Sequence, residues 1–236
     1  MVTRVGPDIP DLSVLDGIQL KAIPHEYSTT FENIYENGQR RQILSAYSGP
    51  LTIDDVPLSW RSAPLVHLAP IAQEYSPALY KCFPNSLVCA TVQGWLRSND
   101  EQNNVIFKPH ADIRSSLTGI DILVMSVADV FGDHALLKEL LTQVRIGVET
   151  LGPEGCRIFH QGDVISVPVE PAEEIDPTGA GDIFAAAFFI QYEQSRDIIS
   201  AAQFANACAS MSVGRIGVLG TPTLPEVEQR VAQMYK

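Results

Sequence analysis

The chain has 236 residues, 45% of them hydrophobic and 19% charged, which is enough apolar side chain to bury the core of one large domain. Its formal net charge of -12, with no basic run longer than Arg40-Arg41, disfavours nucleic acid and acidic membrane surfaces as partners and favours a small molecule. The sequence has neither a membrane-length apolar stretch nor a secretory leader, and its four cysteines lack metal-binding spacing. We therefore expect a cytoplasmic protein with buried thiols.

The first extended segments lie in the region 18–48. The sequences STTFENIYE (28–36) and RRQILSAY (40–47) flank Asn37-Gly38, the dipeptide that a tight hairpin turn prefers. Both faces of these segments mix apolar and polar residues. The pattern fits a small sheet lying over another part of the protein and equally a surface hairpin without a role. We predict a hairpin and leave these two interpretations open.

From Pro64 onward, short apolar runs alternate with helical patterns. The amphipathic stretch DVFGDHALLKELLTQ (129–143) predicts a helix that begins near Asp129. Such alternation builds a mainly parallel sheet with helices on both faces, a three-layer α/β fold in which ligands bind beyond the carboxyl ends of the strands. The predicted buried strands are PLVHLAP (64–70), SLVCATV (86–92), NVIFK (104–108), DILVMS (121–126) and RIGVET (145–150).

A second hairpin and three helices are expected after these strands. GCRIFH (155–160) and DVISVPV (163–169), joined by QGD, have the alternation and the turn residues of an antiparallel pair. The three helices that end the chain are predicted over residues 179–194, 197–213 and 224–234.

The stretch DPTGAGD (176–182) precedes the first of these helices and contains more glycine than a helix cap requires. Gly179 and Gly181 leave the backbone open to a ligand, and the amides of residues 179–182 form an anion hole at the positive end of the helix dipole. A carboxylate at this position would compete with the bound anion. Its presence is explained if Asp182 takes the proton of a hydroxyl that attacks a bound phosphorus. The alternative is an Asp182 that only complements the helix dipole.

These residues carry a resemblance to a known family. DPTGAGDIFAAAF (176–188) looks like the C-terminal signature of the PfkB family, the ribokinase-like carbohydrate, cyclitol and nucleoside kinases. VETLGPEGC (148–156) is similar to the strand and turn before that signature, and RVGPD (4–8) resembles the family's VGxD segment. The resemblance implies ATP-dependent transfer of the γ-phosphoryl group to a substrate hydroxyl by one ribokinase-like domain, residues 1–236, with an α/β/α core. It also implies a small β lid, and the hairpin region 18–48 falls where that lid would be.

The resemblance implies roles for individual residues near the signature. Asp182 resembles the catalytic base of the family, and the amides of Gly179, Ala180 and Gly181 resemble its anion hole. The residues that would bind the nucleotide are Thr150, Gly152, Gly155 and, near the base or ribose, Asn206.

The residues that would hold the metal and the acceptor match the family pattern less closely than the signature does. In the family an Asn-x-x-Glu element organises Mg²⁺ and phosphate, and the corresponding turn here reads SVAD (126–129), so Asp129 would act on the metal through water. Arg114 is either a further site residue or a surface arginine. Two stretches resemble inositol-kinase-type members more than ribokinase or adenosine kinase: STTFENIYENGQRRQI (28–43) and VQGWLR (92–97). The sequence pattern alone does not identify the polyol.

The family normally has a strand, a substrate-binding aspartate and a Gly-Gly turn before the VGxD segment, and here Met1 almost directly precedes RVGPD. We therefore expect this chain to bind Mg-ATP but to phosphorylate a polyol slowly, and an open sheet edge or the lid to favour a homodimer. The alternative is a non-catalytic nucleotide-binding protein, which the carboxylate of Asp182 disfavours. A dinucleotide-binding redox enzyme is disfavoured because no G-x-G-x-x-G follows an early strand.

Overall fold

The computed structural model describes residues 1–9, 11–36 and 39–235. The chain divides into two compact units, each of which gathers segments from separate parts of the sequence. No helix within the described residues is both long and apolar enough to cross a bilayer. The first unit comprises Met1–Ala63, Ala69–Asn85 and Val92–Ser116, and the second comprises Pro64–Leu68, Ser86–Thr91 and Leu117–Lys236.

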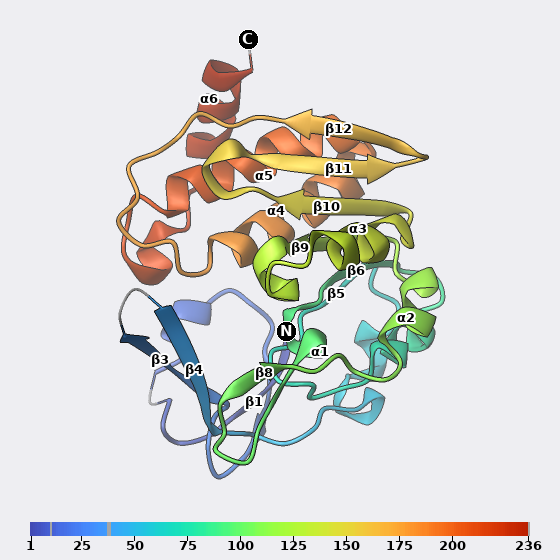
Figure 1. The fold of residues 1–236 in the computed structure, drawn as a ribbon, viewed down its shortest axis with the longest axis vertical. Coiled ribbons are helices and arrows are strands. Elements are labelled where there is room, and N and C mark those ends of the chain that lie inside the picture. The colour runs from blue at the N-terminus through green and yellow to red at the C-terminus, as the bar shows by residue number, and fades with distance from the viewer. Residues whose placement is uncertain (10, 37–38, 236) are drawn as a thin grey trace. The chain divides into compact units, whose positions relative to one another are not determined.

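A six-stranded sheet forms the centre of the second unit (Figure 1). Its strands are β5 (Leu65–Leu68), β6 (Leu87–Thr91), β9 (Ile122–Ser126), β10 (Ile146–Thr150), β11 (Cys156–His160) and β12 (Asp163–Val167). They lie in the order β12-β11-β10-β9-β6-β5. The four strands from β5 to β10 are parallel, and β11 and β12 extend the sheet in antiparallel fashion. The predicted mainly parallel sheet is confirmed.

Helices cover both faces of this sheet (Figure 1). They are α3 (His134–Thr142), α4 (Ala180–Ser195) and α5 (Ile198–Ser212), and α6 (Leu224–Met234) packs on α5. The face with Ile146 and Val148 contacts α4 and α5, where Phe188 is fully buried. The other face contacts α3 so closely that a Cβ on Gly147 would lie 2.3 Å from the carbonyl oxygen of Leu141. The three-layer α/β/α arrangement is therefore confirmed.

The structure corrects the predicted helix over residues 129–143. Asp129 belongs to a separate 3-10 turn, and α3 begins later, after its cap residue Asp133. Phe131 and Gly132 have left-handed φ angles of 55° and 89°, which interrupt a right-handed helix. The carboxylate of Asp133 then accepts hydrogen bonds from two amides of the first turn of α3.

The predictions for the C-terminal part of the chain are confirmed. β11 and β12 form the expected hairpin, and the two residues between them, Gln161 and Gly162, have left-handed φ angles of 54° and 90°. Two successive left-handed residues are the geometry of a type I′ turn, which follows the twist of the strands. The ends of α4, α5 and α6 lie within one residue of the predicted positions.

Among the residues that the structure describes, the first unit contains three two-stranded sheets and short helices. The predicted hairpin in the region 18–48 is confirmed by antiparallel pairing from Thr30 with Ala46 to Glu36 with Gln39, while Asn37-Gly38 lies outside the described residues. The elements are β1 (Val2–Val5) parallel to β2 (Lys21–Pro24), β3 (Thr30–Glu36) with β4 (Gln39–Ala46), β7 (Arg97–Asn99) with β8 (Val105–Phe107), α1 (Gln93–Leu96) and α2 (Ile113–Ser116).

The expectation of a buried strand at NVIFK is wrong. This stretch forms β8, which pairs antiparallel with β7 in the first unit and exposes Ile106 and Phe107. The cause is the local turn before it, where the carboxylate of Asp100 accepts hydrogen bonds from the amides of Gln102 and Asn104. That turn returns the chain along β7 instead of leading it into the central sheet.

Arg97 joins the β3–β4 hairpin to the rest of the first unit. Its guanidinium carbon lies 4.6 Å from the centre of the Phe31 ring, and its Nε donates to the carbonyl oxygen of Ile71 at 3.0 Å. A third contact runs from Nη1 to the side-chain oxygen of Gln42 at 3.4 Å. Arg97 is only 8% exposed, so its cation is desolvated. Its contacts connect β7, to which it belongs, with Phe31 of β3 and Gln42 of β4.

All four cysteines are free thiols. Cys89, Cys156 and Cys208 are buried in the second unit, as expected, whereas Cys82 of the first unit is half-buried. Burial raises the pKa of Cys156 and of Cys208 to about 12, and it also raises the pKa of Cys89.

A largely buried imidazole lies between β5 and α4. The ring of His67 meets the ring of Phe189 edge-on, with centroids 4.9 Å apart, and its Nε2 lies 3.3 Å from the hydroxyl of Thr91. Burial lowers the pKa of His67 from 6.5 to about 4, because the apolar surroundings disfavour the charged ring. His67 is therefore neutral in the folded protein at neutral pH.

This imidazole makes folding stability depend on pH. Between pH 6.5 and about 4 the unfolded chain binds a proton at His67 that the folded chain does not, so stability falls as the pH is lowered through this window. We expect this group alone to remove on the order of 2 kcal/mol between neutral pH and about pH 5, measured by urea unfolding. His67→Phe, which keeps a ring against Phe189, should show a correspondingly smaller loss. Equal losses in both proteins would contradict the assignment.

Candidate functional site

The start of α4 has the conformation that its glycines predict. Gly179 caps the helix with a left-handed φ of 81°, which is available to glycine without strain. A Cβ added to Gly179 or Gly181 would have no heavy atom within 4 Å, so space is open beside both residues. The amide of Ala180 donates to the carbonyl oxygen of Pro177 at 3.2 Å. Asp182 lies exposed in the first turn.

Asp176 fastens this helix start to a distant loop. One carboxylate oxygen accepts a hydrogen bond from the amide of Thr178 at 3.0 Å, and the other accepts one from the amide of Gly217 at 3.0 Å. The bond from Gly217 is the main reason why the pKa of Asp176 lies below its ordinary value, with the bonds from Thr178 adding to it. Sequence reasoning missed this role, although an Asp two residues before a polar turn residue is the pattern of a side-chain-capped turn.

A cavity of about 480 Å³ opens beside the start of α4 in the second unit. Its walls come from the segments that follow β9, β10 and β12, from the first residues of α4, and from α5. Two carboxylates, Glu170 and Glu174, also line it. Of the predicted site residues, those that line the cavity are Thr150, Gly152, Gly155, Ala180, Gly181 and Asn206.

The remaining predicted residues lie elsewhere. Gly179 and Asp182 adjoin the lining residues Ala180 and Gly181 in sequence but do not line the cavity themselves. Asp129 lies in the 3-10 turn after β9, next to the lining residue Ala128. Arg114 lies exposed in α2 of the first unit.

The turn between β10 and β11 needs both of its glycines. Gly152 and Gly155 have left-handed φ angles of 59° and 93°, and the amide of Leu151 closes the turn by donating to the carbonyl oxygen of Gly155 at 2.8 Å. A Cβ on Gly155 would lie 2.3 Å from the carbonyl oxygen of Val167, whereas one on Gly152 would have no heavy atom within 4 Å. Gly155 thus allows close strand packing, and Gly152 leaves the cavity side open.

An ion pair between a buried carboxylate and a guanidinium that is 40% exposed lies directly before this turn. Glu149 of β10 is 2% exposed, and its carboxylate oxygens lie 2.9 and 3.0 Å from Nη2 of its cross-strand neighbour Arg157 on β11. The Nε atom of Arg157 is buried and has no hydrogen-bond partner among the described residues. The pair therefore ties together the two strands that carry the Gly152–Gly155 turn. Sequence reasoning missed it, although a lone acid inside an apolar strand was a signal for a buried partner.

Asn206 lines the cavity and also supports its wall. Its Nδ2 donates to the carbonyl oxygen of Val167 at 2.9 Å and lies 3.4 Å from the hydroxyl of Tyr235, which itself donates to the carbonyl oxygen of Pro168 at 2.8 Å. At 3% exposure, this amide is part of the packed interior. The chain that leaves β12 is thus held to α5 by Asn206 and to the end of the chain by Tyr235.

The carboxylate of Asp129 has a structural role in its turn. Its Oδ2 accepts hydrogen bonds from the amide of Ser126 at 2.7 Å and from the hydroxyl of Ser126 at 3.2 Å, which forms a capping box. Within the described part of the chain no three His, Cys, Asp or Glu side chains are grouped so that they could hold a metal ion.

Comparisons with known proteins connect this site to a family. Residues 106–224, half of the chain, match the pfkB family of carbohydrate kinases. Ribokinase from Bacillus subtilis is 42% identical over 81 residues, which are 34% of this chain and 28% of that protein. Inositol 3-kinase from Arabidopsis thaliana is 39% identical over 70 residues, 30% of this chain and 20% of that protein. The chain thus spans only a fifth to just over a quarter of the length of these relatives.

Solved structures share the fold over nearly the whole chain. A pyrophosphate-dependent kinase of the ribokinase family, complexed with a pyrophosphate analog and myo-inositol, superposes with a TM-score of 0.81 at 19% identity and covers 97% of this chain and 84% of its own. Arabidopsis thaliana ribokinase, complexed with ribose and ATP, gives a TM-score of 0.73 at 21% identity and covers 98% and 80%. These structures establish a ribokinase-like α/β fold. Together with the family match, they show that this chain belongs to the pfkB family of carbohydrate kinases.

The ion pair beneath the cavity turn leads to a stability prediction. Glu149→Gln should lower the free energy of unfolding by about 1 to 3 kcal/mol, because the partly exposed guanidinium of Arg157 loses its charge-assisted hydrogen bonds to a buried carboxylate. The losses of unfolding free energy caused by Glu149→Gln and Arg157→Gln should sum to more than the loss in the double variant, because both substitutions remove the same interaction. A double-mutant cycle by urea unfolding measures this coupling.

The control is Glu193→Gln, which removes one partner of the exposed pair between Glu193 and Arg196. That pair is solvated, so its loss should change stability by less than about 1 kcal/mol. Additive effects of Glu149→Gln and Arg157→Gln would mean that the pair does not act as a unit.

Proposed function

We propose that the protein transfers the γ-phosphoryl group of ATP to a hydroxyl group of a small polyol, a sugar, an inositol or a nucleoside. The observation that carries this proposal is the cavity whose lining contains the first residues of α4. Its volume of about 480 Å³ lies within the range of small-molecule sites. Membership of the pfkB family and the names of the relatives, among them ribokinase and inositol 3-kinase, support the reaction class.

The phosphate groups would lie at the start of α4. The amides of Gly179, Ala180 and Gly181 are at the positive end of the helix dipole, and neither glycine has a side chain that would block a phosphate oxygen. The amide of Ala180 donates to the carbonyl oxygen of Pro177 and would exchange that bond for one to phosphate. The carboxylate of Glu174 would repel phosphate from another wall, whereas that of Glu170 is paired with Arg230 at 3.3 Å. In this arrangement the helix start stabilises the charge that develops on the transferred group.

The nucleoside would occupy the remainder of the cavity. The Thr150 to Gly155 turn and the face of α5 around Asn206 provide walls with mostly small and uncharged side chains. Such walls have room for a base and ribose, which supports ATP rather than pyrophosphate as the donor, although three solved structures with TM-scores of 0.79 to 0.81 are of pyrophosphate-dependent kinases. Pyrophosphate is therefore the proper alternative donor in any assay.

Asp182 would act as the general base. The acceptor hydroxyl oxygen forms a bond to the γ-phosphorus, the bond from that phosphorus to the bridging oxygen breaks, and ADP leaves. The hydroxyl proton passes to the carboxylate of Asp182, which is exposed in the first turn of the same helix. One turn of helix would then supply both the base and the anion-stabilising amides.

Magnesium fits this site as an ion carried mainly by the donor. Mg²⁺ keeps much of its hydration and takes one or two carboxylates together with substrate phosphates, and Asp129 would contact it through water. When bound, the ion neutralises charge on the phosphate groups. A nucleotide-binding protein without catalysis is the second candidate, because the cavity and the start of α4 belong to one compact unit and would bind nucleotide without an acceptor.

The first experiment replaces the proposed base. Asp182→Asn should lower kcat by about 10² to 10⁴, because a neutral amide cannot accept the hydroxyl proton, while the Kd for ATP stays within a few-fold. Turnover is measured with ATP and with pyrophosphate across a panel of sugars, inositols and nucleosides. Glu173→Gln, a charge loss at an exposed acid before the helix that does not line the cavity, is the control and should keep activity. Near-normal turnover by Asp182→Asn would remove it from the mechanism, and ATP binding with no turnover by the wild type would favour the second candidate.

The second experiment tests the metal contact. Asp129→Asn keeps an oxygen that can cap the turn but removes the charge, so the Mg²⁺ concentration for half-maximal activity should rise several-fold with little loss of thermal stability. Asp133→Asn removes the same charge from the cap of α3 and should leave the Mg²⁺ titration unchanged. If both variants titrate like the wild type, Asp129 does not contact the metal.

A further inference from the structure

The cavity beside the start of α4 has one wall without regular structure, residues 168–174, which we call the wall segment. It lies between β12 and α4 and contains neither helix nor strand, and the side chains of residues 170–174 are exposed. Pro168 and Pro171 have no amide hydrogen to donate, which disfavours continuation of β12 as a paired strand. The members that line the cavity are Val169, Glu170, Pro171, Ala172 and Glu174. The shape of this wall therefore depends on contacts that other elements supply.

The end of the wall segment nearest α4 is attached to the end of α5. The amides of the next two residues, Ile175 and Asp176, both donate to the carbonyl oxygen of Val213, at 2.8 and 3.0 Å. These bonds fix the chain where it enters the glycine-rich start of α4. They lie beyond residue 174, so the conformation of the wall segment itself requires a second attachment.

That second attachment comes from the last helix and the residue after it. The hydroxyl of Tyr235, directly after α6, donates to the carbonyl oxygen of Pro168 at 2.8 Å. Nη1 of Arg230 on α6 lies 3.3 Å from Oε2 of Glu170. Among the described residues, these are the hydrogen bond and the ion pair in which the wall segment takes part.

The support is itself fixed in the core of the second unit. α6 begins with a capping box, and Val227 is 1% exposed in a core cluster with residues of α5. The ring of Tyr235 packs against the core cluster of the central sheet, and Nδ2 of Asn206 lies 3.4 Å from its hydroxyl oxygen. The hydroxyl that binds Pro168 is therefore held in place before any ligand enters the cavity.

We propose that Tyr235, together with Arg230, is a positioning residue for the nucleoside part of the phosphoryl donor. By holding the wall segment, the two side chains keep the cavity in the conformation that fits a base and ribose. If the wall has this conformation in only a fraction of the molecules, the apparent Kd rises by the inverse of that fraction. The inference rests on the proposed function in that the ligand is ATP, but it requires neither Asp182 nor an acceptor.

Isothermal titration calorimetry with Mg-ATP and with Mg-tripolyphosphate tests the proposal, because tripolyphosphate has the same chain of phosphates without a nucleoside. Tyr235→Phe keeps the ring in the core and loses the hydroxyl. It should raise the Kd for ATP by about three- to tenfold, the effect of one lost hydrogen bond. The Kd for tripolyphosphate should stay within about twofold, since its phosphates bind at the start of α4. In turnover assays the change should appear in KM for ATP, with kcat within about twofold.

Arg230 is tested by a pair of variants. Arg230→Gln removes the charge that faces Glu170 and should raise the Kd for ATP by about two- to threefold, because the ion pair is partly exposed. Arg230→Lys keeps a cation on a long side chain and should bind ATP like the wild type. In the double variant Tyr235→Phe/Arg230→Gln the Kd for ATP should rise by at least about fivefold.

The first control separates positioning from a general loss of stability. Val227→Ala removes buried packing in the first half of α6, so it should lower the temperature of thermal unfolding while both Kd values stay unchanged. If Val227→Ala weakens ATP binding as much as Tyr235→Phe does, the stability of the helix explains the effect and the inference is overturned.

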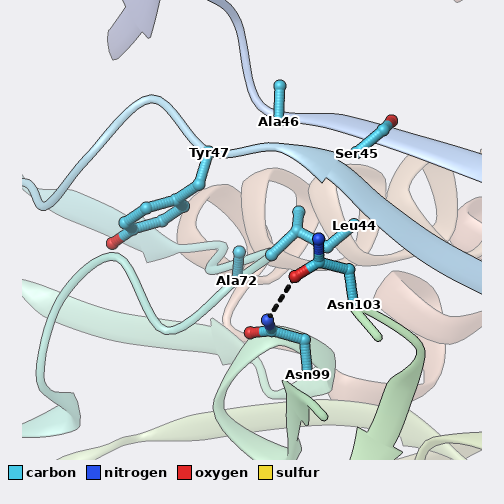
Figure 2. Close-up of a pocket in the computed structure, with 7 residues that line it drawn as sticks. All are labelled: Leu44, Ser45, Ala46, Tyr47, Ala72, Asn99 and Asn103. Atoms are coloured by element: carbon cyan, nitrogen blue, oxygen red, sulfur yellow. Dashed lines mark hydrogen bonds between the residues drawn. The ribbon is translucent and has the colours of Figure 1, made fainter. Parts of the chain in front are cut away.

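The second control lies in the first unit, where a hollow of about 420 Å³ lies beside the end of β4 and the turn between β7 and β8 (Figure 2). The amide of Leu44 donates to the carbonyl oxygen of Asn103 at 2.9 Å. Nδ2 of Asn99 donates to Oδ1 of Asn103 at 3.0 Å, the bond drawn in Figure 2. Asn99→Ala thus removes a side-chain hydrogen bond at the wall of a hollow, as Tyr235→Phe does, but in the other unit. It should leave both Kd values unchanged.

Two results overturn the inference directly: a Kd for ATP within about twofold of the wild type in the folded double variant, or equal losses of affinity for ATP and tripolyphosphate. Circular dichroism shows whether each variant is folded. Failure of the inference is distinguishable from failure of the proposed function. Turnover by the wild type with unchanged ATP affinity in the double variant rejects only the positioning role. Weakened ATP binding in the double variant, with no turnover of any acceptor by the wild type, rejects only phosphoryl transfer.

Discussion

The packing of α4 against the central sheet is the constraint on which the candidate site depends. Phe188 and Phe189 are fully buried, and the face of β10 with Ile146 and Val148 belongs to the same core cluster. Fully burying such side chains contributes about 1.5 to 3 kcal/mol each, so the helix cannot shift along the sheet without losing part of the core. A helix fixed in this way also fixes its first turn. The amides at its start are therefore held in place before a ligand binds, which is the condition under which fixed dipoles are most effective.

Around this helix start, the cavity walls are joined by contacts between residues far apart in sequence. Asp176 binds the amide of Gly217, Asn206 binds the carbonyl oxygen of Val167, and Glu149 pairs with Arg157 across two strands. The amide of Asn206 and the carboxylate of Glu149 are buried and would be costly to leave unpaired, whereas the bond between Asp176 and Gly217 lies at the surface. The residues that line the cavity and the residues that support it are thus partly distinct, and substitutions at the second kind would change the shape of the site without touching a ligand.

The sequence allowed the prediction of elements that local chemistry determines. The apolar strands, the hairpin at Gln161-Gly162 and the three C-terminal helices follow from short-range patterns, and so does the glycine-rich start of α4. The family resemblance added the nucleotide-side residues, of which Asn206 and the Thr150 to Gly155 turn do line one cavity.

Other features could not be read from the sequence, because they depend on tertiary partners. A short apolar run such as NVIFK fits a buried strand and an exposed hairpin equally well, and only the turn at Asp100 decides between them. The break before α3 requires a left-handed Phe131, which no residue preference predicts. The contact between Asp176 and Gly217 joins residues 41 positions apart. The hollow in the first unit likewise depends on how a turn meets the edge of β4.

The distribution of the cysteines has a practical consequence for studying this molecule. Burial raises the pKa of Cys156 and of Cys208 to about 12, so these buried thiols are almost entirely un-ionised at neutral pH. Maleimide dyes attack the thiolate, so labelling at these positions is slow, and the same holds for buried Cys89. Cys82, half-buried in the first unit, is then the site at which a fluorophore attaches without any engineered substitution. A spectroscopic probe can thus be confined to the unit that contains the β3–β4 hairpin, leaving the unit with the α4 cavity unmodified.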